Sequence, residues 1–495
     1  MKNLLYIISL CGLLTACDLQ EEPYGFYSDD NFYKSETDAE SGLLYAYNAL
    51  TFLEYSRGIF YIGDIPTETM SPKSDEAGDV YQLENWIANR ETEQLQYYFK
   101  YCYIAINRAN TVIDHIQNSS VLSETARRRI LGEAYFLRAW NYFNLVRTFG
   151  IVPVQTKMVA ELSQTTPPMA TGLDQLYDLI LGDLARADNL LEVNKVFGRA
   201  DKVAAQSLMA KAYLTIASSK EHNVHRYTEM RREPQIMYDS AAYWAGKVVR
   251  DYKNVYDFDT NLRDIYDVDK PTGPEHIFIM PIDRSGTQEG NYSKLPLLFL
   301  PSNNSVPFYI RYGNGDLQRA NGNGWGVFLC NDEFVETQFS TTDKRRTELI
   351  HRDIYDASGN PIVPNQVKGY FSSKYVDPDF IGERTSARPY LIRFSDIALV
   401  YAEAAGPEAG LAYVNRIRER AGVTPLPSGM TTDKFREAVI KERALELAFE
   451  GNRLYDLRRT ASVTATVPEA TKLSEEQAAF YPIPQRELDL NPNVK

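Results

Sequence analysis

DKFREAVIKERALELAFEGNRLYDLRRT, residues 433–460, is the stretch that decides the fold of this 495-residue chain. Four apolar or small residues in it recur at intervals of four, three and four, which predicts one apolar stripe along a helix. These residues are Ile440, Ala444, Leu447 and Gly451. Because glycine has no Cβ, we expect a neighbouring backbone to pack closely against the end of this stripe.

Charged residues follow the same helical spacing. Glu442, Glu446 and Glu450 form one row. Glycoside hydrolases use a pair of carboxyl groups as their catalytic residues. Arg443 and Arg453 lie beside them in the sequence, so a structural ion-pair network is the favoured interpretation. Residues spaced three apart can also pair along a helix. A ladder of such pairs is predicted for Glu450, Arg453 and Asp456.

Helical periodicity also dominates the chain before residue 256. The predicted helices span 37–55, 92–118, 123–148, 173–191, 200–219 and 238–251. AYFLRAWNYFNL (134–145) and AQSLMAKAYLTI (205–216) align, with small and large residues at matching positions 71 residues apart. This offset is close to twice the ~34-residue period of tetratricopeptide helix pairs. The sequence therefore predicts a mainly α fold in which tetratricopeptide-like helical pairs form a curved scaffold.

An irregular region interrupts the helical pattern. Residues 256–389 are rich in Asn, Gly, Pro, Asp and aromatics, and contain short strand-like pieces such as 276–280. Helical period returns at 390–405, 408–421 and 431–459. We therefore interpret the irregular region as a lobe inserted into the helical body, and a functional one, because long irregular segments in compact proteins usually are.

The N-terminus indicates export and lipidation. Lys2 precedes an apolar run over residues 4–14 that is too short to span a bilayer, so residues 1–16 are predicted to be a lipoprotein signal peptide. Leu14-Thr15-Ala16-Cys17 resembles a bacterial lipobox, which makes Cys17 the lipidation site and 17–36 the lipidated tether. An ordinary secretory signal with an incidental cysteine is the alternative.

Several other functions are disfavoured. A net charge of −13 argues against nucleic acid as a partner. The pair His222 and His225 lacks a third zinc ligand, and residues 257–268 lack the glycine and the final glutamate of a calcium loop. Cys102 lies in an aromatic run and is expected to be a buried thiol. We predict no metal and no cofactor.

Four separate stretches carry a family resemblance. They are residues 433–460, EAYFLRAWNYFNLVRTFGIVPV (133–154), YLIRFSDIALVYAEAA (390–405) and YPIPQRELDLNPN (481–493). With the lipobox, they make the chain resemble the SusD/RagB family of outer-membrane nutrient-binding lipoproteins. The resemblance implies a SusD-like helical region at 37–255, an irregular ligand-binding lobe at 256–389 and a second helical region at 390–495.

The resemblance also implies a function. It predicts a non-enzymatic receptor, lipid-anchored on the outer face of the outer membrane, that binds oligosaccharides and passes them to a SusC-like TonB-dependent transporter. A peptide-binding receptor of the RagB type and a transporter lid without its own glycan site remain alternatives. A surface glycosidase using paired carboxylates is a further, less favoured alternative.

RANGNGWGVF, residues 319–328, places one tryptophan among glycines and asparagines. A phosphate-binding reading fails, because no Gly-Lys-Ser/Thr follows and the next residues are strand-like. An exposed indole can instead stack on the apolar face of a sugar while amides bond its hydroxyls. Trp325 and Asn323 are therefore predicted ligand contacts, unless the indole turns inward as a plug.

Two further segments supply predicted contacts. In DVYQLENWIANR (79–90), Trp86 is expected to form a second aromatic wall, or else to cap the following helix. Its companions in this segment are Tyr81, Asn85, Asn89 and Arg90. In residues 308–312, strand alternation predicts that Tyr309 and Arg311 point away from Tyr312, and Tyr309 is the favoured contact.

Overall fold

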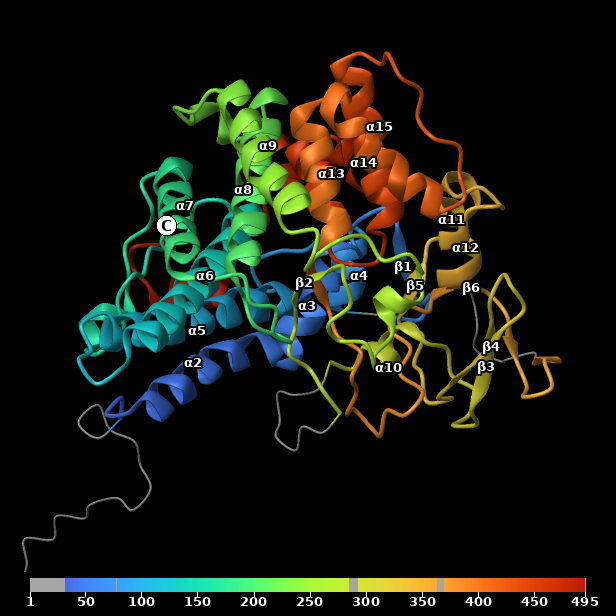
Figure 1. Cartoon of the computed structure of the whole chain (residues 1–495), viewed down its shortest axis with the longest axis horizontal. Coiled ribbons are helices and arrows are strands. Elements are labelled where there is room, and N and C mark those ends of the chain that lie inside the picture. Colours follow the sequence, from blue (N-terminus) through green and yellow to red (C-terminus); the bar gives the residue numbers. More distant parts are fainter. Residues whose placement is uncertain (1–31, 77, 285–292, 363–368, 495) are drawn as a thin grey trace, which may run out of the picture.

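A computed structural model describes residues 32–76, 78–284, 293–362 and 369–494. Cys17 and the predicted signal peptide and tether up to residue 31 lie outside this part of the chain. The N-terminal part consists of long helices that lie on the left of Figure 1. They are α2 (Glu36–Thr51), α3 (Leu53–Gly63), α5 (Glu93–Ile116), α6 (Glu124–Phe149), α7 (Leu173–Leu190), α8 (Lys202–Glu221) and α9 (Pro234–Asp251).

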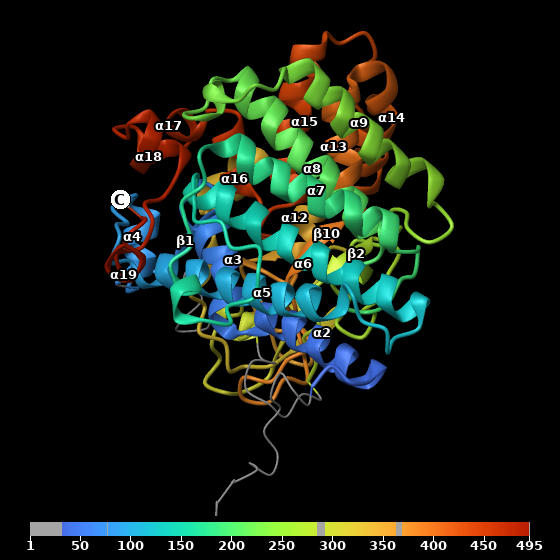
Figure 2. The same ribbon diagram turned by 90° about the vertical axis from the view of Figure 1, so that its left-hand side faces the viewer.

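Consecutive helices pack side by side: α5 on α6, α6 on α7, α7 on α8 and α8 on α9, as Figure 2 shows. α6 begins where the Ser123 hydroxyl accepts a hydrogen bond from the Ala126 amide, and it ends at Gly150, whose φ is 76°. Neighbours on several sides bury most of this helix, and small residues such as Ala134 and Ala139 let them approach. The predicted mainly helical fold of stacked pairs is confirmed.

The C-terminal helices continue the same array. α13 (Phe394–Ala405) packs against α8 and α9, and also against α14 (Pro407–Arg420) and α15 (Thr432–Glu446). One hydrophobic core runs through both helical regions, so they form one body. The C-terminal region ends with four short helices: α16 (Arg453–Arg459), α17 (Val463–Thr466), α18 (Glu475–Ala479) and α19 (Gln485–Leu490). Among the described residues, no helix combines the length and the apolar character needed to cross a membrane.

Short strands build the inserted lobe on the right of Figure 1. Its largest sheet has the strand order β4-β3-β7-β8 and a small core of its own. These strands are β3 (Phe308–Arg311), β4 (Leu317–Ala320), β7 (Ile354–Tyr355) and β8 (Pro361–Ile362). The lobe also holds α10 (Leu295–Phe299), α11 (Asp332–Gln338), α12 (Lys344–Leu349), β6 (Ile350–His351) and β9 (Phe371–Ser372).

Two antiparallel strand pairs tie the lobe to the helical body. β1 (Met70–Pro72) pairs with β5 (Phe328–Cys330), and β2 (His276–Ile279) pairs with β10 (Tyr390–Arg393). The predicted strand near 276–280 is therefore present. The helix predicted over 390–405 begins only at Phe394, because its first four residues complete this strand pair.

The predicted helix over 431–459 is also interrupted. α15 ends at Glu446 and α16 begins at Arg453, and between them Phe449 and Gly451 have φ angles of 64° and 75°. The predicted close approach at Gly451 is present, but in a turn: a Cβ there would lie 2.3 Å from Ile59 Cγ2. Its amide also donates to Asp64 Oδ2 at 2.6 Å, so the turn is joined to the end of α3.

This contact predicts a specific effect of Gly451→Ala. Gly429 also has a positive φ, 78°, but its Cβ position has no neighbour within 4 Å, so Gly429→Ala is a matched control. Both variants suffer the strain of alanine at positive φ, about 1–2 kcal/mol. Gly451→Ala adds the overlap with α3, for a further loss of about 1–3 kcal/mol in the free energy of unfolding. Urea denaturation of both variants measures the difference, and equal losses would contradict the packing argument.

Candidate functional site

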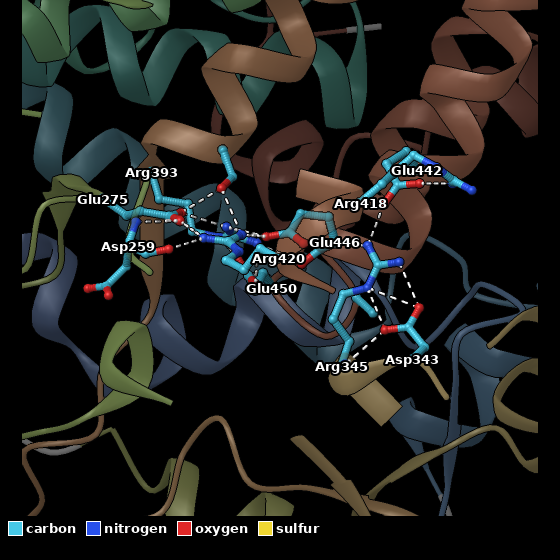
Figure 3. A network of polar contacts seen from close by, with 12 residues as sticks. Asp259, Glu275, Asp343, Arg345, Arg393, Arg418, Arg420, Glu442, Glu446 and Glu450 are labelled. Atoms are coloured by element: carbon cyan, nitrogen blue, oxygen red, sulfur yellow. Dashed lines mark hydrogen bonds and ion pairs between the residues drawn. The ribbon is translucent and has the colours of Figure 1, made fainter. Parts of the chain in front are cut away.

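The row of glutamates on α15 and the turn after it lies in a buried charge network (Figure 3). Glu446 accepts hydrogen bonds from Arg393 at 2.9 Å and Arg420 at 2.6 Å. Glu450 accepts from Arg393 at 2.8 Å and from Lys374 at 2.6 Å. The carboxylates are almost completely buried and each is bonded to cations, so they are closed to a substrate. The predicted structural network is confirmed.

The partners in this network differ from those predicted. Arg443 pairs with Asp396 and Asp456, and Arg453 pairs with Glu68 near the end of α3. The predicted ladder of Glu450, Arg453 and Asp456 is wrong. α15 ends before Glu450, which bonds Arg393, and although Arg453 and Asp456 share α16, Arg453 pairs with Glu68 and Asp456 pairs with Arg443 and Arg459.

Glu275, the residue that precedes β2, also belongs to this network. Burial by itself raises the pKa of this carboxyl, but the charges of Arg420 and Arg393 and their hydrogen bonds lower it to about 2. Arg393 lies 2.9 Å from Glu275, and the Ser395 hydroxyl donates to the same carboxylate at 2.7 Å. The lobe, the strand pair and α15 are thereby joined through one cluster of charges.

This lowered pKa predicts a stability change in acid. An unfolded glutamate has a pKa near 4.5, so between about pH 4.5 and pH 2 the unfolded chain binds the extra proton and stability falls as the pH falls. Arg420→Gln removes one cation, which raises the folded-state pKa of Glu275 toward that of the unfolded chain, so this loss becomes smaller and ends at a higher pH. Urea unfolding across pH 2–6 measures both curves, and superimposable pH profiles would contradict the assignment.

Trp325 is fixed on a loop that packs against the end of α10. The Trp325 amide donates to the Leu297 carbonyl at 2.6 Å, and the Gly326 amide donates to the Leu300 carbonyl at 2.9 Å. A Cβ on Gly324 would lie 2.0 Å from the Leu300 oxygen, and one on Gly322 would lie 2.0 Å from the Val306 oxygen. The glycines therefore allow close backbone packing. They do not form a phosphate cradle.

The Trp325 side chain points outward. It is 45% exposed, so it does not act as an interior plug. Lys294 Nζ lies 5.6 Å from the centre of the ring and pairs with Glu383 at 2.6 Å. Asn323, two residues earlier, is exposed. The loop thus presents an indole and an amide to solvent, and the Lys294–Glu383 pair lies beside the indole. This arrangement suits stacking and hydrogen bonding of a polar ring.

Tyr309 lies on the outer face of the lobe's largest sheet. Phe308, Ile310 and Tyr312 point into the small core, whereas Tyr309 is half-buried and Arg311 is exposed. The predicted alternation is therefore confirmed. Segment 378–383 connects this sheet to the tryptophan loop. The Arg319 guanidinium donates to the Pro378 carbonyl, and Glu383 bonds Lys294 beside Trp325.

The expectation of an exposed aromatic wall at Trp86 is wrong. Trp86 follows α4 (Asp79–Glu84) and is only 8% exposed. Its Nε1 donates to the Pro66 carbonyl at 2.8 Å, and its ring stacks on Tyr481 with centres 5.8 Å apart. The C-terminal segment around Tyr481 covers the ring, and the local sequence of residues 79–90 carries no sign of that contact.

Trp86 still contributes to the lining of a hollow of about 810 Å³. Asn89 and Arg90 also line it, and the Arg90 guanidinium donates to the Ile483 carbonyl at 3.0 Å. Tyr81 and Asn85 do not line it: Tyr81 is 51% exposed on α4, and the Asn85 amide bonds the Tyr81 carbonyl. Trp325 is not part of this hollow, so the two predicted tryptophans do not form opposite walls of it.

A second hollow, about 690 Å³, was not anticipated from the sequence. It lies between α2, α5 and α19, and its lining includes Tyr45, Tyr97 and Tyr103. The aromatic run YYFKYCY at 97–103 is the signal that could have pointed to it, because one helix cannot bury so many rings on one side. Cys102, in the same run, is buried as expected.

Within residues 32–76, 78–284, 293–362 and 369–494, no group of three or more His, Cys, Asp or Glu side chains could hold a metal ion.

Comparison with known proteins finds matches at both ends of the chain. A model of the SusD family matches residues 353–495, and a model described as starch-binding associating with outer membrane matches residues 33–214. SusD-like protein P2 of Formosa agariphila is 24% identical over 496 residues, which covers 92% of this chain and 89% of the relative.

Solved structures agree. A SusD homolog from Bacteroides thetaiotaomicron has a TM-score of 0.76 at 20% identity, covering 95% of this chain and 98% of its own. A laminarin binding SusD-like protein has a TM-score of 0.73 at 23% identity, covering 93% and 98%. At these identities the structures establish a shared fold.

Proposed function

The chain belongs to the SusD/RagB family, and from this premise we propose that it is a receptor that binds oligosaccharides and delivers them to a SusC-like TonB-dependent transporter. The observation that carries the proposal is Trp325, a large ring held outward by backbone hydrogen bonds on a loop of the lobe. An indole fixed in this way loses little conformational freedom when a sugar stacks on it.

The Lys294–Glu383 pair beside the ring and the exposed Asn323 on the same loop supply hydrogen-bonding groups, and Tyr309 offers a second aromatic surface in the same lobe. The name of the laminarin binding SusD-like protein is consistent with a glycan ligand. In this proposal Trp86, Asn89 and Arg90 form a separate polar hollow near the C-terminus. Tyr81 and Asn85 are left outside the site.

The proposed location is the outer face of the outer membrane, with Cys17 lipidated. Its support is the lipobox at residues 14–17 and the family description that mentions association with the outer membrane. Metabolic labelling with a radioactive fatty acid tests the anchor. Label is expected on the intact protein and not on Cys17→Ser.

Trp325→Ala is expected to weaken glycan binding by at least about thirtyfold, the effect of removing a dominant contact of about 2 kcal/mol. Isothermal titration against a panel of neutral and charged oligosaccharides measures it. Tyr243→Ala is the matched control, because Tyr243 is 55% exposed on the helical body and should leave binding unchanged. Unchanged binding by Trp325→Ala would refute the site.

The same titrations, an uptake assay and an assay for reducing sugar decide between the alternatives. Binding of peptides and of no glycan would identify a RagB-type peptide receptor. Loss of nutrient uptake on gene deletion, fully restored by Trp325→Ala, would identify a transporter lid. Release of reducing sugar by the purified protein would support the glycosidase hypothesis, although the carboxylates suggested for it are buried and ion-paired in the charge network.

A further inference from the structure

One row of side chains crosses the whole outer face of the β4-β3-β7-β8 sheet. Tyr309 in β3 stands opposite Arg319 in β4 and opposite Tyr355 in β7, and Tyr355 stands opposite Pro361 in β8. The inner face of the sheet packs on the lobe core through Phe308, Ile310 and Ile354. Because side chains alternate between faces, this outer row is turned away from that core.

Arg311 joins the row on the same face. It lies two residues after Tyr309 on β3, opposite Leu317, so it is a diagonal neighbour of Arg319. Diagonal neighbours of this kind have Cα atoms about 7–8 Å apart. Tyr309 therefore has two arginine neighbours on this face: Arg311 on its own strand and Arg319 opposite it on β4.

Both guanidinium groups are held in place. Arg311 lies over the Tyr355 ring at 4.2 Å and donates to the Gly359 carbonyl. A Cβ on Gly359 would lie 2.6 Å from the Arg311 Nη2 atom, so this glycine leaves the room that the side chain needs. Arg319 donates to the Pro378 carbonyl at 2.9 Å. Each arginine keeps further N–H groups for a ligand, since a guanidinium carries five donors.

The charges on this face are not balanced. Arg319 has a carboxylate near it, Asp379 at 3.5 Å, and both side chains are largely exposed. No salt bridge joins Arg311 to a carboxylate within the described part of the chain. Arg352 shows the contrast: it also lies over a tyrosine, Tyr370, but pairs with Asp332 and Glu336.

From this arrangement we propose that the outer face of the sheet binds an anionic sugar, with its ring on Tyr309 and its carboxylate or sulfate group held by Arg311 and Arg319. Arginine binds both kinds of anion in a planar, bidentate geometry. Tyrosine offers a flat apolar face with a polar edge, which suits a pyranose ring. This inference rests on the proposed function and narrows its ligand to acidic oligosaccharides.

The test titrates the mature protein with three probes of equal length: an oligogalacturonate, a sulfated carrageenan oligosaccharide and a neutral laminarin oligosaccharide. We expect tighter binding of at least one anionic probe than of the neutral one. Arg311→Gln and Arg319→Gln should each weaken that binding about tenfold, the effect of losing one charged hydrogen-bonding partner. Added salt should weaken it as well, because the site is exposed.

Arg352→Gln is the matched control, since it removes the same charge from another tyrosine-stacked arginine of the lobe. It should bind all three probes as the wild type does. If the two arginine variants bind the anionic probes as tightly as the wild type, or if they lose neutral and anionic binding equally, the inference fails. Neutral binding that depends on Trp325 would then still support the receptor, whereas binding of no saccharide at all would refute both.

Discussion

The burial of charge around Arg393 is the constraint on which the rest of the structure depends. This arginine is 1% exposed and bonds Glu275, which precedes β2, and Glu446 and Glu450, at the end of α15 and in the turn after it, so three separate parts of the chain meet here. A buried arginine without carboxylates destabilises the folded protein by several kcal/mol, and so do buried carboxylates without a cation. The partners are therefore stable only together. The lobe can therefore dock in one register on the helical body.

That docking gives a loop-rich region a defined surface. β1–β5 and β2–β10 add main-chain hydrogen bonds beside the charge network, and the turn at Gly451 closes against α3. Trp325 then takes its position from α10 backbone atoms, and Tyr309 takes its position from strand register. Binding residues carried on loops over a rigid scaffold are a common arrangement in receptors.

Individual predictions failed where a distant segment supplies the partner. Trp86 was expected at the surface, but Tyr481, nearly four hundred residues later, stacks on it. Arg453 was expected to pair along one continuous helix, but a turn separates it from Glu450, and its partner is Glu68. Spacing along a chain informs only about neighbours on one element. The spacing does not indicate which side chain from a distant segment contacts these residues.

The amino-acid pattern alone determined the stacked helices, the position of the inserted lobe, the alternation around Tyr309 and the structural ion pairing of the α15 glutamates. Each depends on a local period, 3.6 residues for a helix and two for a strand. The tertiary structure alone decided which arginine meets which carboxylate, which tryptophan remains exposed, and that Arg311, Arg319 and Tyr309 share one face. These depend on contacts between segments far apart in the chain, which no local period encodes.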